Sequence, residues 1–253
     1  MPGLLFSQKM QSGLADELAA RGNRVVTFDP LGHGDSDRPR DMWRYSIGAF
    51  AEQTVALLDH LELPRAIVGG TSLGANVTLE LAALAPRRLR GMIIEMPVLD
   101  NAIPAAGAMF TPLLFAFTFG EPVMRAVARG ARAVPSAHLP FLLQISRDWL
   151  AQDPGPSGAV LQGILFGRTA PDRRLRTTFL APALVIGHPR DPLHPFSDAD
   201  MLAGELPNGR LINASSIAEL RLRPARLTAK IVEFVEECWN DETAATQPRA
   251  AAR

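Results

Sequence analysis

The stretch "AIVGGTSLGANVTLELAALAP" (residues 66–86) joins an apolar run to a pattern typical of a helix, and Ser72 lies at the joint between Gly70 and Gly74. A serine at the tip of a strand-to-helix turn sits in strained backbone, and so tight a turn leaves no room for a side chain at either glycine. The strain directs the hydroxyl into the crevice at the carboxyl end of the sheet, where the first amide of the helix, from Leu73, can stabilise an oxyanion. We therefore predict that Ser72 is a nucleophile.

Two other structures also place glycines around a serine, namely a phosphate-binding glycine loop and a plain tight turn. The stretch "GGTSLG" (69–74) has neither the lysine of a P-loop nor the glycine spacing of a dinucleotide-binding loop. The nucleophile interpretation is therefore favoured over both.

Short aliphatic runs alternate with helical patterns on both sides of this turn. The predicted strands are residues 25–28, 66–70, 91–96, 183–187 and 210–214. Apolar residues at helical spacing predict helices over 50–61 and 227–238. Apolar strands separated by helices predict an α/β fold, with a mostly parallel sheet covered by helices on both faces.

Residues 101–180 break this alternation, because they contain several apolar helical patterns and no convincing strand. We predict a helical cap over 101–180, an α/β core over 1–100 and 181–239, and a disordered tail over 240–253. The cap includes "MFTPLLFAFTF" (109–119), which carries four phenylalanines. Two interpretations of the cap stay open: a lid over an apolar pocket, or ordinary core packing among the extra helices.

The bulk properties exclude several classes of function. The chain has 253 residues, 47% of them apolar, and a formal net charge of zero, so nothing in its electrostatics favours nucleic acid or an anionic membrane as a partner. Its one cysteine, Cys238, excludes disulfides within the chain and thiolate metal clusters. The longest apolar stretch is about half of the ~20 residues that span a bilayer, and no secretory leader is recognisable, so we expect a cytoplasmic protein.

Three motifs resemble those of the α/β-hydrolase family. The stretch "GTSLG" (70–74) is similar to its nucleophile elbow, and "FDPLGHGDSDRP" (28–39) to the loop before the next helix in cap-bearing members. The stretch "ALVIGHPRDPLHP" (183–195) is similar to the late strand whose loop carries the acid of the catalytic triad. The resemblance covers nearly the whole chain apart from the cap and the tail.

This resemblance implies that Ser72 attacks a carbonyl carbon while a histidine takes its proton and a carboxylate orients that histidine. The position matching the family's acid is Asp191, which could instead simply cap the turn before Pro192. Glu95 and Asp100, after the preceding strand, are alternative positions for the acid. No cofactor or metal is implied, and the oligomeric state is left open.

The histidine of the triad is missing from its usual place. In the family it normally follows the last strand, but residues 211–227 contain none. The five histidines of the chain are His33, His60, His138, His188 and His194. We take His194 as the candidate base, although a histidine three residues from the acid often only packs against it. Without a base, a residual acceleration of roughly 10³–10⁴ over water would remain, so we expect weak hydrolysis.

The start of the chain departs from the family as well. The stretch "PGLLFSQKM" (2–10) is similar to the loop after the family's third strand, which makes the Leu4 amide the second oxyanion donor. Because the chain begins after that central strand, we expect an N-terminal truncation, with direct pairing of strands 25–28 and 66–70 as the alternative.

The sequence thus predicts a hydrolase for a small or medium lipophilic ester-like substrate. The alternatives are a catalytically degenerate member that binds a small ligand without efficient turnover, and a truncated product with neither activity.

Overall fold

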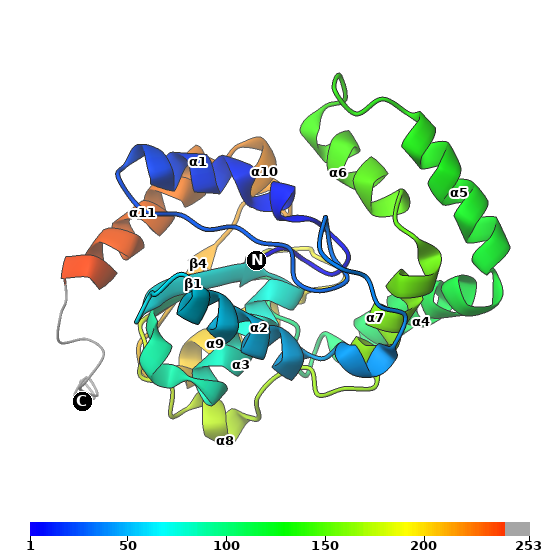
Figure 1. The fold of residues 1–253 in the computed structure, drawn as a ribbon. Coiled ribbons are helices and arrows are strands. Elements are labelled where there is room, and N and C mark those ends of the chain that lie inside the picture. The colour runs from blue at the N-terminus through cyan, green and yellow to red at the C-terminus, as the bar shows by residue number, and fades with distance from the viewer. Residues whose placement is uncertain (241–253) are drawn as a thin grey trace. The chain divides into compact units, whose positions relative to one another are not determined.

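A computed structural model describes residues 1–240 of the chain, which divide into two compact units (Figure 1). The helical unit comprises Met1–Ser46 and Pro104–Arg168. The sheet unit comprises Ile47–Ile103 and, among the described residues, 169–240. The tail predicted over 240–253 lies, apart from its first residue, outside the described residues.

The sheet unit is built on four parallel strands that neighbour one another in chain order. They are β1 (Ala66–Thr71), β2 (Leu89–Glu95), β3 (Ala183–Gly187) and β4 (Gly209–Asn213). Four of the five predicted strands are therefore confirmed to within a few residues. Strand β3, between β2 and β4, is buried at every position, which explains why its sequence is aliphatic throughout.

Helices cover both faces of this sheet (Figure 1). One face carries α2 (Ile47–His60), α3 (Leu73–Leu84), α8 (Arg173–Arg176) and α9 (Phe196–Glu205). The other face carries α11 (Ala225–Asn240), with the short α10 (Glu219–Leu222) against it. Phe50 of α2 and Phe234 of α11 are buried, as the apolar spacing of these helices requires. The predicted α/β class and two-sided cover are confirmed.

The helical unit contains no strand among its described residues. Its helices are α1 (Ser12–Ala20), α4 (Ile103–Phe119), α5 (Glu121–Ala133), α6 (Phe141–Leu150) and α7 (Pro154–Leu165), with 3-10 turns at Gln8–Gln11 and Met42–Arg44. Within residues 1–240 no single helix is long and apolar enough to cross a membrane. Only α4 and α5 together reach that length and apolarity, and they are bent by 99° where they meet.

Residues 1–46 group with the helices of 104–168. The Gln152 side chain donates a hydrogen bond to the Leu5 carbonyl and accepts one from the Arg38 guanidinium at 2.9 Å. We placed 1–46 in the core from the order of motifs alone. The division of the chain into a core and a cap that covers it stays a prediction.

The strand predicted over residues 25–28 is wrong, because these residues form no strand in the structure. The segment instead bonds to the first 3-10 turn: Thr27 Oγ1 lies 2.6 Å from Gln8 Oε1, and the Gln8 amide donates to Asp29 Oδ1 at 2.6 Å. A β-branched run favours extended backbone, but a strand also needs a neighbouring ladder of amides and carbonyls. The composition of residues 25–28 does not indicate whether such a neighbouring strand is present.

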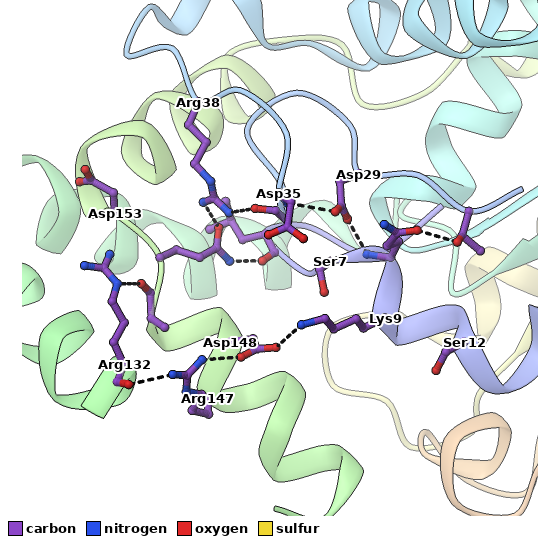
Figure 2. Close-up of a pocket in the computed structure, with 16 residues that line it drawn as sticks. Ser7, Lys9, Ser12, Asp29, Asp35, Arg38, Arg132, Arg147, Asp148 and Asp153 are labelled. Atoms are coloured by element: carbon purple, nitrogen blue, oxygen red, sulfur yellow. Dashed lines mark hydrogen bonds and ion pairs between the residues drawn. The ribbon is translucent and has the colours of Figure 1, made fainter. Parts of the chain in front are cut away.

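A polar pocket of about 530 Å³ lies within the helical unit (Figure 2). Its charged side chains bond mainly to one another and to backbone carbonyls. Arg147 Nη1 lies 2.8 Å from Asp148 Oδ1, and Lys9 Nζ lies 3.5 Å from Oδ2 of the same carboxylate. Arg147 also donates to the carbonyls of Ala131 and Arg132. This arginine therefore ties α6 to the carboxyl end of α5.

Candidate active site

The backbone at Ser72 has the strain that the sequence predicts. Ser72 follows β1 and precedes α3 with φ 54° and ψ −111°, a conformation that costs a non-glycine residue of order 1–3 kcal/mol. Its amide donates to the Glu95 carbonyl at 2.8 Å, which fixes the turn to the end of β2. A Cβ at Gly70 would lie 2.4 Å from the carbonyl carbon of Gly74, so only glycine allows this close approach.

The Ser72 hydroxyl lies within hydrogen-bond distance of a histidine that in turn contacts a carboxylate. Ser72 Oγ is 2.9 Å from His194 Nε2, and His194 Nδ1 is 2.9 Å from Asp191 Oδ2. Both His194 and Asp191 lie in the loop between β3 and α9, at the carboxyl end of the sheet. The structure thus brings together all three residues that we took from the sequence as nucleophile, base and acid.

The hydrogen bonds define which nitrogen of His194 carries the proton. The Asp191 carboxylate can only accept, so His194 Nδ1 donates to it. In the neutral ring Nε2 then has a free lone pair, which accepts the proton of the Ser72 hydroxyl. This is the tautomer in which a histidine can act as general base toward a serine.

Asp191 is held in place by the loop that contains it. Its Oδ1 accepts from the backbone amides of Leu193 at 2.9 Å and His194 at 3.0 Å, which leaves Oδ2 for the imidazole. Burial acts to raise the pKa of the Asp191 carboxyl, but the His194 ring and these amides outweigh it and hold the pKa below its usual range. The carboxylate is therefore charged at neutral pH.

The two predicted oxyanion donors belong to different units. Leu73 is the first residue of α3, and a helix leaves its first amides without intrahelical carbonyl partners. The Leu73 amide thus remains available beside Ser72. Leu4 belongs to the helical unit, where its carbonyl accepts from Trp149 Nε1 at 3.4 Å. Its role as second donor stays a prediction.

Comparison with known proteins identifies the fold family. A family model described as alpha/beta hydrolase fold matches residues 1–129. The protein named "Putative carbamate hydrolase RutD" from Pseudomonas savastanoi pv. phaseolicola is 30% identical over 220 residues, which cover 78% of each chain. The chain belongs to the α/β-hydrolase fold family.

Two other proteins are similar to this chain, one over nearly its whole length and one over a third of it. The crystal structure of the enol-lactonase from Burkholderia xenovorans LB400 covers 93% of this chain and 89% of its own, with a TM-score of 0.73 and 21% identity, which shows the shared fold. The dihydrolipoyllysine-residue acetyltransferase component of the acetoin cleaving system of Pseudomonas putida is 37% identical over 85 residues. That match covers 33% of this chain and only 22% of that protein.

The remaining histidines of this α/β-hydrolase chain have other surroundings. His60 ends α2 and is exposed, and His138 is exposed between α5 and α6. His33 lies in the helical unit with its Nδ1 3.0 Å from the Leu31 carbonyl, and burial lowers its pKa to about 4. His188 is buried, with Nδ1 2.9 Å from the Ser216 carbonyl.

The two alternative acids that we considered, Glu95 and Asp100, also have other surroundings. Asp100 is exposed in the segment between β2 and α4. Glu95 is buried and contacts Arg221, Thr71 and His188. Sequence reasoning missed Arg221, which lies in the segment where the family usually places its histidine. The one local signal in the sequence is that residues 211–227 contain no histidine.

Asp191→Asn is expected to lower kcat by about 10³-fold to 10⁴-fold. An amide can donate its proton to His194 Nδ1, which favours the tautomer with a proton on Nε2 and so removes the base from Ser72. Steady-state cleavage of a p-nitrophenyl ester measures the loss, and Asp200→Asn, an exposed position on α9, is the matched control. Equal kcat values for Asp191→Asn and the unmodified chain would exclude Asp191 as the orienting acid.

Proposed function

We propose that the chain is a serine hydrolase that cleaves a small or medium lipophilic ester through Ser72, with His194 as general base and Asp191 as the orienting acid. The observation that carries this proposal is the pair of 2.9 Å contacts from Ser72 Oγ to His194 Nε2 and from His194 Nδ1 to Asp191 Oδ2. The first distance is within the range expected of a base that takes a proton directly, and the second is that of an ordinary hydrogen bond.

The chemistry follows from these contacts. His194 Nε2 takes the hydroxyl proton as Ser72 Oγ bonds to the carbonyl carbon, and the Leu73 amide stabilises the resulting oxyanion. The intermediate collapses when the imidazolium gives that proton to the leaving alcohol, so an acyl group stays on Ser72. A water molecule, deprotonated by the same histidine, then attacks the acyl carbon, and the imidazolium returns the proton to Ser72 Oγ as the bond to the acyl group breaks and the acid leaves. Asp191 stabilises the imidazolium in both steps.

The lipophilic character of the substrate was predicted from the apolar stretch at 109–119, which lies in α4. Its sequence "IPAAGAMFTPLLFAFTF" has no charged residue. The rings of Phe115 and Phe119 stack on each other with their centroids 5.6 Å apart, and both side chains are largely exposed. Relatives named for carbamate and enol-lactone hydrolysis support a substrate with a carbonyl centre bonded to oxygen or nitrogen. We propose that the acyl part of such a substrate is apolar.

The expectation of weak turnover rested on the lack of a base, and the His194 contact removes that reason. We propose that hydrolysis is efficient, with the base supplied from the loop that also carries the acid. The degenerate ligand-binding alternative would require Ser72 to be unreactive in spite of a histidine at 2.9 Å.

Hydrolysis of p-nitrophenyl esters of increasing acyl length tests the proposal. We expect turnover well above background, with kcat/KM rising from acetate to medium chains, because a longer chain buries more apolar surface. Background rates with every ester and with a fluorophosphonate probe would favour the degenerate alternative. Turnover that is highest for acetate and falls with chain length would contradict the lipophilic substrate only.

A further inference from the structure

Three buried polar side chains contact one another next to Ser72, and one of them, Glu95, also lies 3.3 Å from His188 Nε2. The Thr71 hydroxyl donates to Glu95 Oε2 at 2.5 Å and accepts from Arg221 Nη2 at 2.8 Å. Arg221 Nη1 pairs with the other oxygen of the same carboxylate. Thr71 ends β1, Glu95 ends β2 and Arg221 belongs to α10, so the cluster links three elements. We call these three residues the elbow clamp.

The elbow clamp lies beside two positions of strained backbone. Thr71 and Glu95 are paired across β1 and β2, and the residue after each has a left-handed conformation: Ser72 with φ 54° and Met96 with φ 56°. The Ser72 amide also bonds to the Glu95 carbonyl. Strained backbone of this kind persists only where the surrounding structure over-determines it. The clamp supplies such contacts at the position immediately before each strained residue.

The charges in the clamp are isolated from solvent. The side chains of Glu95 and Arg221 are only 3% and 5% exposed. Burial acts to raise the pKa of Glu95, but the Arg221 charge and the contacts with Arg221 and His188 outweigh it and hold the pKa well below its usual range. A buried ion pair such as Glu95–Arg221 is weak evidence for a contribution to stability. Its position next to Ser72 therefore indicates a different role.

We propose that Thr71, Glu95 and Arg221 are positioning residues that hold Ser72 in its strained conformation, with its hydroxyl toward His194. The inference rests on the proposed function of Ser72 as nucleophile. Without the clamp, the turn can relax and release strain, and the hydroxyl moves away from Nε2. A displacement of about 1 Å at a reacting group can cost on the order of 10²-fold in rate.

Two substitutions at Thr71 separate the hydroxyl from the shape of the side chain. Thr71→Val keeps the branched shape but removes the bonds to Glu95 and Arg221, and we expect kcat to fall about 10-fold to 10²-fold with KM nearly unchanged. Thr71→Ser keeps the hydroxyl and is expected to restore most of the lost kcat. Arg221→Gln should resemble Thr71→Val, and Arg223→Gln, an exposed arginine two positions further along, is the matched control.

Hydrogen exchange of the peptide over residues 70–76 gives a readout that does not depend on turnover. Thr71→Val is expected to speed exchange of the Ser72 amide, while urea unfolding changes little, since a clamp acts locally. A merely structural role would instead lower global stability and leave the ratio of local to global protection unchanged.

The inference is overturned if Thr71→Val keeps both the kcat and the amide protection of the unmodified chain, or if Thr71→Ser is as impaired as Thr71→Val. Should Arg221→Gln fail to fold, the two Thr71 variants still decide. Failure of the hydrolase proposal is distinguishable, because the unmodified chain would then show only background turnover, or Ser72→Ala would keep full turnover, whatever the exchange at residues 70–76.

Discussion

Ser72→Ala is expected to lower ester turnover by about 10⁵-fold to 10⁶-fold, to the level of the remaining oxyanion contacts and substrate binding. The alanine cannot form the acyl intermediate, and His194 Nε2 then faces a methyl group. The measurement is p-nitrophenyl ester cleavage together with fluorophosphonate labelling, which we expect to disappear.

Ser197→Ala is the control for this substitution, because Ser197 is an exposed serine of α9 in the same unit. It is expected to leave both turnover and labelling unchanged. Labelling of another residue in Ser72→Ala, with turnover retained, would refute the assignment of the nucleophile.

His194→Ala is expected to lower kcat by about 10³-fold or more while KM changes little, because the base acts on the reacting proton and not on ground-state binding. The serine hydroxyl is a poor nucleophile at neutral pH unless an adjacent base takes its proton. Steady-state kinetics over several ester concentrations separates kcat from KM.

His60→Ala provides the matched control, since His60 is exposed at the end of α2 and far along the chain from the triad. We expect its kinetics to equal those of the unmodified chain. If His194→Ala were nearly as active as the unmodified chain and His188→Ala were inactive, the base would be His188 and our assignment wrong.

The features predicted correctly from the sequence are those that depend on neighbouring residues. The elbow at 70–74 was predictable because the close approach of Gly70 and Gly74 requires glycine at both positions. Strand β3 was the most predictable, because a parallel strand with helices on both faces is buried throughout and its sequence is continuously aliphatic, whereas β4 at the end of the strand order is partly exposed.

The features that the sequence did not predict depend on contacts between distant segments. The run at 25–28 has strand composition but pairs with no ladder, and composition does not report a partner. The orientation of His194 depends on the turn before it, where Arg190 has φ 62° and two amides fix Asp191. Arg221 contacts Glu95 across 126 residues of chain, so no local pattern connects them.

The most direct test of the central claim, that His194 is the base for Ser72, is the second-order rate constant for fluorophosphonate inactivation, with the adduct mapped by mass spectrometry. This measurement needs no knowledge of the natural substrate. Our account predicts an adduct on Ser72 in the unmodified chain, in His60→Ala and in His194→Ala, with the rate constant lower by about 10²-fold or more only in His194→Ala. Equal rate constants for His194→Ala and the unmodified chain would contradict it.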